Sequence, residues 1–146
     1  MMRSKLGLLG EEKNDQSLIL DLLTWMHEMK ADYTNTFCYL MGEKFEKKKY
    51  YENKKFLSCK ERWKDRLYSN SNSPEKYLQL MNSVNPFVIP RNHKVEEALD
   101  AANKDDFQPL KKLIEILSKP YLQNKNIIEY QLPSTHKEKY QTYCGT

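Results

Sequence analysis

The sequence predicts a mainly α-helical protein of about six amphipathic helices with an irregular C-terminal tail. Two observations predict this class: apolar residues recur at helical spacing over most of the chain, and capping residues and prolines stand at the boundaries of these segments. No segment has a convincing strand pattern, and a length of 146 residues suits one domain of ordinary size. We therefore expect a linker over residues 1–14, a helical domain over 15–118 and an irregular tail over 119–146.

Capping residues mark the first two predicted helices. Asp15 can cap a helix that ends near Lys30, and Asp32 can cap a second helix that Gly42 stops. Both segments carry apolar residues at helical spacing, which places these residues on one face. The apolar faces are Ile19, Leu22, Leu23 and Met26 in the first helix and Tyr33, Phe37, Leu40 and Met41 in the second.

The third and fourth predicted helices differ in how much of their surface they bury. The segment from about Tyr50 to Tyr68 is charged on most faces, so we expect it at the surface with a narrow buried stripe. Ser73 followed by Pro74 is a strong start for the fourth helix, because a capping hydroxyl precedes a proline at the first helical position. The two stripes are Phe56, Cys59 or Lys60, Trp63 and Leu67, and then Tyr77, Leu78, Met81 and Val84.

A proline-bounded connector precedes a predicted helical hairpin. Residues 86–90 are apolar but too short and too proline-flanked for a central strand, so we expect an extended, buried connector. Asn92 and Asp106 can cap the fifth and sixth helices, which a short loop joins as an antiparallel pair. Pro120 stops the sixth helix, and the tail beyond it is expected to run over the surface of something else. The apolar faces are Val95, Ala98, Leu99 and Ala102, and then Leu110, Leu113, Ile114 and Leu117.

Composition argues against several classes of protein. The chain has four glycines and none of them cluster, so we expect no phosphate-binding loop and no self-contained kinase or dinucleotide enzyme. No apolar run approaches the ~20 residues needed to cross a bilayer. The three cysteines are widely spaced, which argues against a disulfide framework and fits a reducing compartment. We therefore expect a cytoplasmic protein without a membrane partner, in which two of the three cysteines are buried.

Positive charge is concentrated in residues 43–66, which hold ten Lys or Arg and five acids. Basic residues interleaved with aromatics are typical of a groove that binds single-stranded nucleic acid. The candidate basic patch is Lys47, Lys48, Lys49, Lys54 and Lys55. The other interpretation is a solvated amphipathic helix whose aromatics, among them Phe56 and Trp63, face the core. We favour the solvated helix over nucleic-acid binding.

Spacing predicts no catalytic residue and no metal site. The carboxylates form no obvious catalytic pair, and His27, His93 and His136 have no ligand spacing with one another or with a cysteine. Cys144 stands third from the end of the sequence, on a tail predicted to be exposed. An accessible thiol there is either a reactive group or an inert terminal thiol, and the residues leave both interpretations open.

Five stretches, in order along the chain, carry a family resemblance. They are MRSKLGL at Met2–Leu8, DYTNTF at Asp32–Phe37, NPFVIPRNHKVEEAL at Asn85–Leu99, DDFQPLKKLIEILSKPY at Asp105–Tyr121 and YCGT at Tyr143–Thr146. Together they resemble the C-terminal end of the selenoprotein O family, the YdiU-like protein adenylyltransferases. The lysine-rich stretch from Lys44 to Lys60 matches least.

This resemblance implies a parent protein with a kinase-like, pseudokinase fold that transfers AMP from ATP to Ser, Thr or Tyr hydroxyls of other proteins. In the family, an ATP-anchoring Lys, metal-binding Asp and Asn residues and a base Asp lie in a core that precedes the portion present here. The resemblance thus implies a C-terminal helical fragment without catalytic residues. Its expected partners are the missing N-terminal kinase-like core and the protein substrates of the parent, and ATP and Mg are expected for the full-length parent alone.

The resemblance also marks individual positions. Many family members hold selenocysteine or cysteine where Cys144 stands, and in the family this residue is linked to redox control through a bridge to a cysteine of the core. The other matching positions are Asp32, Asn85, Pro86, Arg91 and Asn92. They have no assigned chemical step, and we interpret them as a capped, proline-set connector that docks the helical hairpin. The alternatives are a stand-alone helical module that binds nucleic acid through residues 43–66, and a protein-interaction module.

Overall fold

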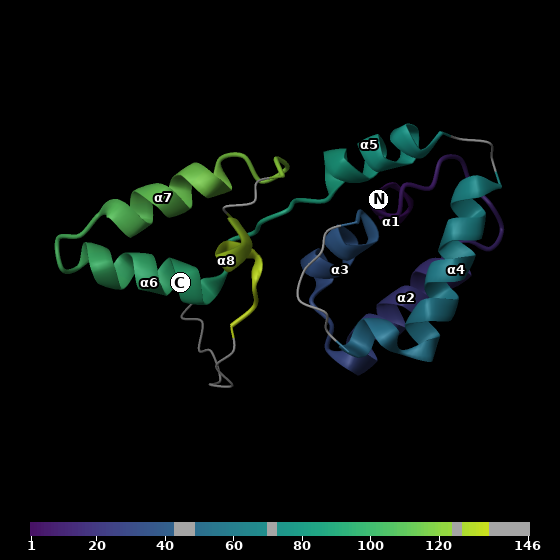
Figure 1. Cartoon of the computed structure of the whole chain (residues 1–146), viewed down its shortest axis with the longest axis horizontal. Coiled ribbons are helices and arrows are strands. Elements are labelled where there is room, and N and C mark those ends of the chain that lie inside the picture. Colours follow the sequence, from purple (N-terminus) through teal and green to yellow (C-terminus); the bar gives the residue numbers. More distant parts are fainter. Residues whose placement is uncertain (43–48, 70–72, 124–126, 135–146) are drawn as a thin grey trace, which may run out of the picture.

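Helices make up all the regular structure in the part of the chain that the computed structural model describes, residues 1–42, 49–69, 73–123 and 127–134. The mainly α-helical class is therefore confirmed (Figure 1). The elements are α1 (Met2–Lys5), α2 (Asp15–Met29), α3 (Tyr33–Leu40), a 3-10 turn (Lys49–Glu52), α4 (Lys54–Tyr68), α5 (Pro74–Val84), α6 (Asn92–Ala102), α7 (Gln108–Leu117) and α8 (Ile128–Gln131).

Local signals set several helix ends as predicted. The Asp32 carboxylate accepts a hydrogen bond of 2.8 Å from the Asn35 backbone N–H and so caps α3. Ser73 is the N-cap of α5, and the helix begins at the proline that follows it. Lys30 adopts a left-handed conformation, with φ of 50°, directly after α2 and ends that helix.

Three predicted caps are displaced by one residue each. The N-cap of α2 is Asn14, and the predicted cap Asp15 is the first helical residue. The N-cap of α6 is Arg91, and the predicted cap Asn92 lies inside the helix. Asp106 stands one residue before the N-cap of α7. The Asp15 carboxylate is engaged in a buried ion pair with Arg66, whereas the Asp106 carboxylate still accepts a hydrogen bond of 3.1 Å from the Gln108 N–H in the first turn of α7.

Residues 1–14 are not a linker in the structure. They contain α1, and the side chains of Leu6 and Leu8 are buried in the core. Gly7 has φ of +69°, and a Cβ at this position would lie 3.0 Å from Met81 of α5. The backbone at Gly7 therefore packs closely against α5. Hydrophobic periodicity in the sequence does not reveal a contact of this kind.

Two hydrophobic clusters divide the described residues. The first lies among the five helices from α1 through α5 and is built around Trp25, Phe37 and Phe56. The second joins the connector to α6, α7 and α8. Cys38 of α3 belongs to the second cluster, so α3 contributes to both. Figure 1 shows the α6–α7 hairpin standing apart from the α1–α5 bundle, with the connector running between them.

The described part of the predicted tail, residues 119–123 and 127–134, packs in part on the chain itself, and the remainder of 119–146 lies outside the described residues. Residues Ile128–Gln131 form α8, and Ile127, Tyr130 and Gln131 are buried in or beside the second cluster. The short helix escapes prediction because it spans about one turn, too few residues to show a helical period.

Candidate functional site

Two of the residues marked by the family resemblance, Asp32 and Arg91, meet where the two hydrophobic clusters join. Asp32 lies at the start of α3, Asn85 and Pro86 open the connector, and Arg91 and Asn92 begin α6. Sequence separation gives no sign that Asp32 contacts Arg91, which lies 59 positions later. The structure brings these two side chains together, and we call their surroundings the Arg91 junction, made of Asp32, Asn35, Phe87, Arg91 and Gln131.

Arg91 and Asp32 form a two-pronged ion pair at the centre of the Arg91 junction. The two hydrogen bonds join Arg91 Nη1 to Asp32 Oδ2 at 2.7 Å and Arg91 Nη2 to Asp32 Oδ1 at 3.0 Å. The side chains are only 12% and 13% exposed. Paired, planar geometry of this kind is both strong and specific in direction. Because Asp32 also caps α3, the pair fixes the start of α6 against the start of α3.

A second set of bonds attaches α8 to the Arg91 junction. Arg91 Nη2 donates to the backbone carbonyl of Gln131 at 2.8 Å, and Asn35 Nδ2 donates to the same oxygen at 3.1 Å. The Gln131 side chain donates in turn to the carbonyl of Phe87 in the connector, also at 2.8 Å. Backbone groups of the connector and α8 are thereby satisfied in a buried place, where an unpaired polar group is costly.

Asn85 and Lys5 fasten the other end of the connector. The buried Asn85 side chain donates to the Lys5 carbonyl at 2.8 Å. The Lys5 ammonium donates to the Val84 carbonyl at 3.0 Å, which satisfies a free carbonyl at the end of α5. Burial lowers the pKa of Lys5. The Cys38 thiol donates to the Pro86 carbonyl at 3.6 Å, so the start of the connector is bonded to both α1 and α3.

The geometry of the Arg91 junction is that of a clamp. Arg91 Nη1 and Nη2 donate to Asp32, Asn35 and Gln131, which joins α6 to α3 and α8. Arg91 Nε is buried and has no hydrogen-bond partner among the described residues. The arrangement positions the α6–α7 hairpin; it presents no nucleophile with an adjacent base. The structure thus supplies a physical role, positioning, for residues that spacing alone could not interpret.

The structure describes residues 49–66 of the basic segment, which form the 3-10 turn and most of α4. Lys47 and Lys48 fall outside the described residues, Lys49 lies in the 3-10 turn, and Lys54 and Lys55 begin α4. Lys55 pairs with an acid of α2 at 2.6 Å, as Arg62 does with another at 2.5 Å.

The aromatics of the basic segment face the protein interior. Phe56 and Trp63 are 0% and 5% exposed, and the Trp63 indole donates to the Leu6 carbonyl at 2.8 Å. Rings in this position cannot stack on bases, which favours the solvated amphipathic helix.

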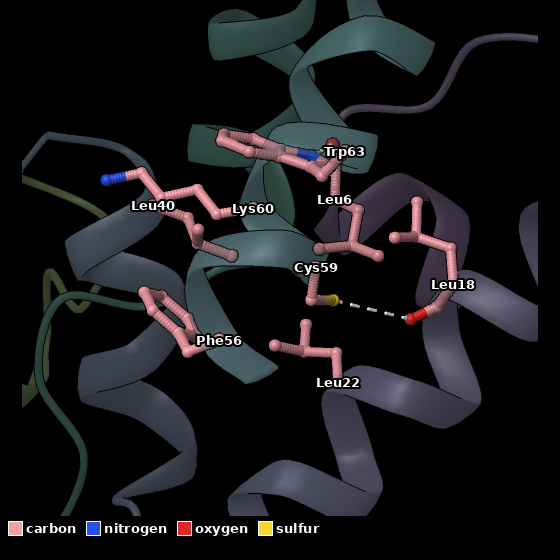
Figure 2. Close-up of a pocket in the computed structure, with 8 residues that line it drawn as sticks. All are labelled: Leu6, Leu18, Leu22, Leu40, Phe56, Cys59, Lys60 and Trp63. Carbon is pink, nitrogen blue, oxygen red and sulfur yellow. Dashed lines mark hydrogen bonds between the residues drawn. The ribbon is translucent and has the colours of Figure 1, made fainter. Parts of the chain in front are cut away.

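A small apolar cavity lies between α2 and α4 (Figure 2). Its volume of about 10 Å³ could hold one water at most, and its walls offer few polar partners to such a water. Its lining is Leu6, Leu18, Leu22, Leu40, Phe56, Cys59, Lys60 and Trp63. Figure 2 shows the Lys60 ammonium pointing away from the Cys59 sulfur. The cavity is a packing defect of the core and has no room for a ligand.

The two described cysteines are buried, as predicted. Burial raises the pKa of the Cys59 thiol to about 11, and the nearby Arg62 charge offsets only part of this. Cys144, the predicted redox residue, lies outside the described residues.

A larger hollow of about 300 Å³ opens beside a buried ion pair that spacing does not predict. Arg66 Nε donates to Asp15 Oδ1 at 2.7 Å, and Arg66 also pairs with Glu12 at 3.1 Å. Burial alone would raise the pKa of Asp15, but the bonds from Arg66 and from the Glu12 backbone N–H outweigh it and lower that pKa. Arg66 follows Trp63 by three residues, so helical spacing already places it next to the buried stripe. Its partner, 51 positions earlier, has no such signal.

No group of three or more His, Cys, Asp or Glu residues in the described part of the chain could hold a metal ion. Within the same ranges, no helix combines the length and apolar character that crossing a membrane requires.

Comparison with known proteins agrees with a helical part of a larger protein. Residues 1–118 match the family described as "Protein adenylyltransferase SelO". The chain is 52% identical over 147 residues to the "Protein nucleotidyltransferase YdiU" of Pelagibacter ubique, 46% over 148 residues to that of Nitrosococcus oceani, and 47% over 147 residues to that of Clostridium botulinum. These matches cover 99% to 100% of this chain and 30% of each relative.

The fold is thus that of a helical region whose two hydrophobic clusters are joined at the Arg91 junction. The chain belongs to the SelO family of protein adenylyltransferases. It spans about 30% of the length of the curated relatives that it matches.

Proposed function

We propose that this chain is the C-terminal helical, structural and regulatory region of a cytoplasmic protein adenylyltransferase. The observation that carries the proposal is the match along essentially the whole chain to relatives named protein nucleotidyltransferase, of which it covers 30%. The kinase-like core, with its ATP and Mg, belongs to the remainder of the parent protein. In this chain the Arg91 junction sets the position of the α6–α7 hairpin.

The reaction proposed for the parent is AMP transfer. The hydroxyl oxygen of a Ser, Thr or Tyr on a protein substrate attacks the α-phosphorus of ATP, and an oxygen–phosphorus bond forms. The bond from the α-phosphorus to the bridging oxygen breaks, so pyrophosphate leaves. The hydroxyl proton passes to a base in the core of the parent. The residues of this chain support that core and take no part in these bond changes.

A labelling experiment on the full-length protein tests the reaction. The protein is incubated with Mg and a protein acceptor, and with ATP labelled on either the α- or the γ-phosphate. We expect label on the acceptor from the α-phosphate alone. Transfer from the γ-phosphate would show a kinase and would refute the proposal. In calorimetry, the isolated chain should give no heat with ATP and Mg, and a micromolar affinity would contradict its structural role.

We further propose that Cys144 is the regulatory half of a redox pair whose partner lies in the core. The full-length protein and its Cys144→Ser variant should then differ in how AMP transfer responds to oxidation by disulfide formation. A Cys59→Ser variant is the matched control, because that thiol is buried and its pKa is raised. An identical oxidation response in the wild type and the Cys144→Ser variant would exclude the regulatory role.

A further inference from the structure

The α6–α7 hairpin leaves large apolar side chains uncovered. Helix α6 buries only Ala98 and helix α7 only Leu113 among their residues. Leu99 on α6 is 49% exposed, Phe107 at the N-cap of α7 is 50% exposed, and Ile114 within α7 is 60% exposed. We call these three residues the hairpin surface.

The geometry of α7 gathers part of this surface on one side. Phe107 and Ile114 are seven residues apart, which is about two turns, so they lie on the same face of the helix. The apolar character continues past the end of α7, where Tyr121 and Leu122 are also exposed. The hairpin therefore offers an exposed apolar face along α7, and Leu99 adds an exposed apolar side chain on α6.

The long helices of the α1–α5 bundle bury more of their surface. Helices α2 and α4 each bury five residues, against one each for α5, α6 and α7. Large exposed apolar residues there, such as Leu20 and Leu57, lie on helices whose other faces already have a full core. The inner apolar residues of the hairpin pack in or against the second cluster, so only the hairpin surface is left for a partner to cover.

The rest of the full-length protein is the partner that fits. Relatives matching this whole chain extend over a further 70% of their own length, so most of the parent lies outside it. Figure 1 shows the hairpin standing away from the bundle, and the Arg91 junction holds it in that position. We propose that the hairpin surface is the face through which this chain docks onto the remainder of the parent, an inference that rests on the proposed role of the chain as part of a larger enzyme.

The test compares one set of substitutions in two settings. The variant L99Q/F107S/I114Q removes the hairpin surface, and L20Q/L57Q is the control that replaces exposed apolar residues of the bundle. In the isolated chain, neither variant should move the unfolding midpoint appreciably, because these side chains are already exposed. In the full-length protein, the hairpin variant should lower the midpoint by about 5 °C, and the control should not.

Three results would overturn the docking surface. One is an unchanged midpoint of the full-length hairpin variant. Another is an equal fall in both settings, which would make the role of these residues internal to the hairpin. The last combines two measurements: sedimentation shows a dimer of the isolated chain that the hairpin variant abolishes, and the full-length unfolding midpoint stays constant. The hairpin surface would then be covered by a second copy of this chain.

AMP transfer is measured separately on the same full-length samples. A midpoint shift without AMP transfer would refute the proposed reaction and leave the docking surface standing. AMP transfer without a midpoint shift would refute the docking surface alone.

Discussion

Replacing Arg91 with methionine removes the donors that hold the Arg91 junction while keeping an apolar stem of similar length. The change deletes two bonds to Asp32, at 2.7 and 3.0 Å, and one to the Gln131 carbonyl, at 2.8 Å. Removing one partner of a buried ion pair costs about 3–5 kcal/mol. Asp32 keeps its bond from the Asn35 N–H and is 13% exposed, so we expect a loss of about 2–3 kcal/mol in the free energy of unfolding.

A double-mutant cycle with Asp32→Asn isolates the pair itself. Asparagine caps helices about as well as aspartate, so this substitution retains the cap of α3 and changes mainly the charge. Urea unfolding at pH 7 of the four proteins should give a coupling energy of at least about 1 kcal/mol. The exposed pair Arg62–Asp21 is the matched control, with side chains 44% and 51% exposed, and its coupling should stay below about 1 kcal/mol. A coupling at the Arg91 junction under about 0.5 kcal/mol would refute the clamp.

Three further predictions concern the α1–α5 bundle. The pKa of Asp15 is lowered in the folded state, so its contribution to stability is present above the unfolded pKa and is lost as pH falls through the folded value. From about pH 5 downward, the Asp15→Asn variant should therefore lose less stability than the wild type. Equal slopes of unfolding free energy against pH in the two proteins would contradict this. Because the pKa of Cys59 is about 11, its thiolate population is roughly 100-fold below that of an exposed cysteine, and mass mapping should find it alkylated slowly in the native chain and rapidly in urea. Trp63→Phe deletes the 2.8 Å hydrogen bond to the Leu6 carbonyl and enlarges the neighbouring cavity, so the free energy of unfolding should fall by about 2 kcal/mol. A change under about 0.5 kcal/mol would mean that another donor satisfies the Leu6 carbonyl.

Local chemistry accounts for the parts of the fold that the sequence predicts well. The start of α3 depends on the Asp32 side chain and a backbone N–H three residues later, and the start of α5 on the proline that follows Ser73. The stripe containing Phe56 and Trp63 is buried as its spacing predicts, because a helix with one apolar face has one low-energy way to lie on a core. These features need no knowledge of distant segments.

Long-range pairing accounts for the corrections. Residues 1–14 resemble a linker because Leu6 and Leu8 show no helical period, yet α4 and α5 supply a surface that buries them. Asp15 resembles a cap, and its carboxylate is instead directed to Arg66. Each of these outcomes is decided by a partner that lies far away along the chain.

The same division applies to the candidate site. The sequence by itself determined the helical class, the positions of most helices and the family resemblance, because periodicity, caps and motifs are local properties of the chain. Only the tertiary structure decided that Arg91 meets Asp32 and Gln131, and that the α6–α7 hairpin keeps an uncovered apolar face. The physical reason is that an ion pair and a buried surface are properties of two segments together, and their energy depends on a distance that neither segment encodes alone.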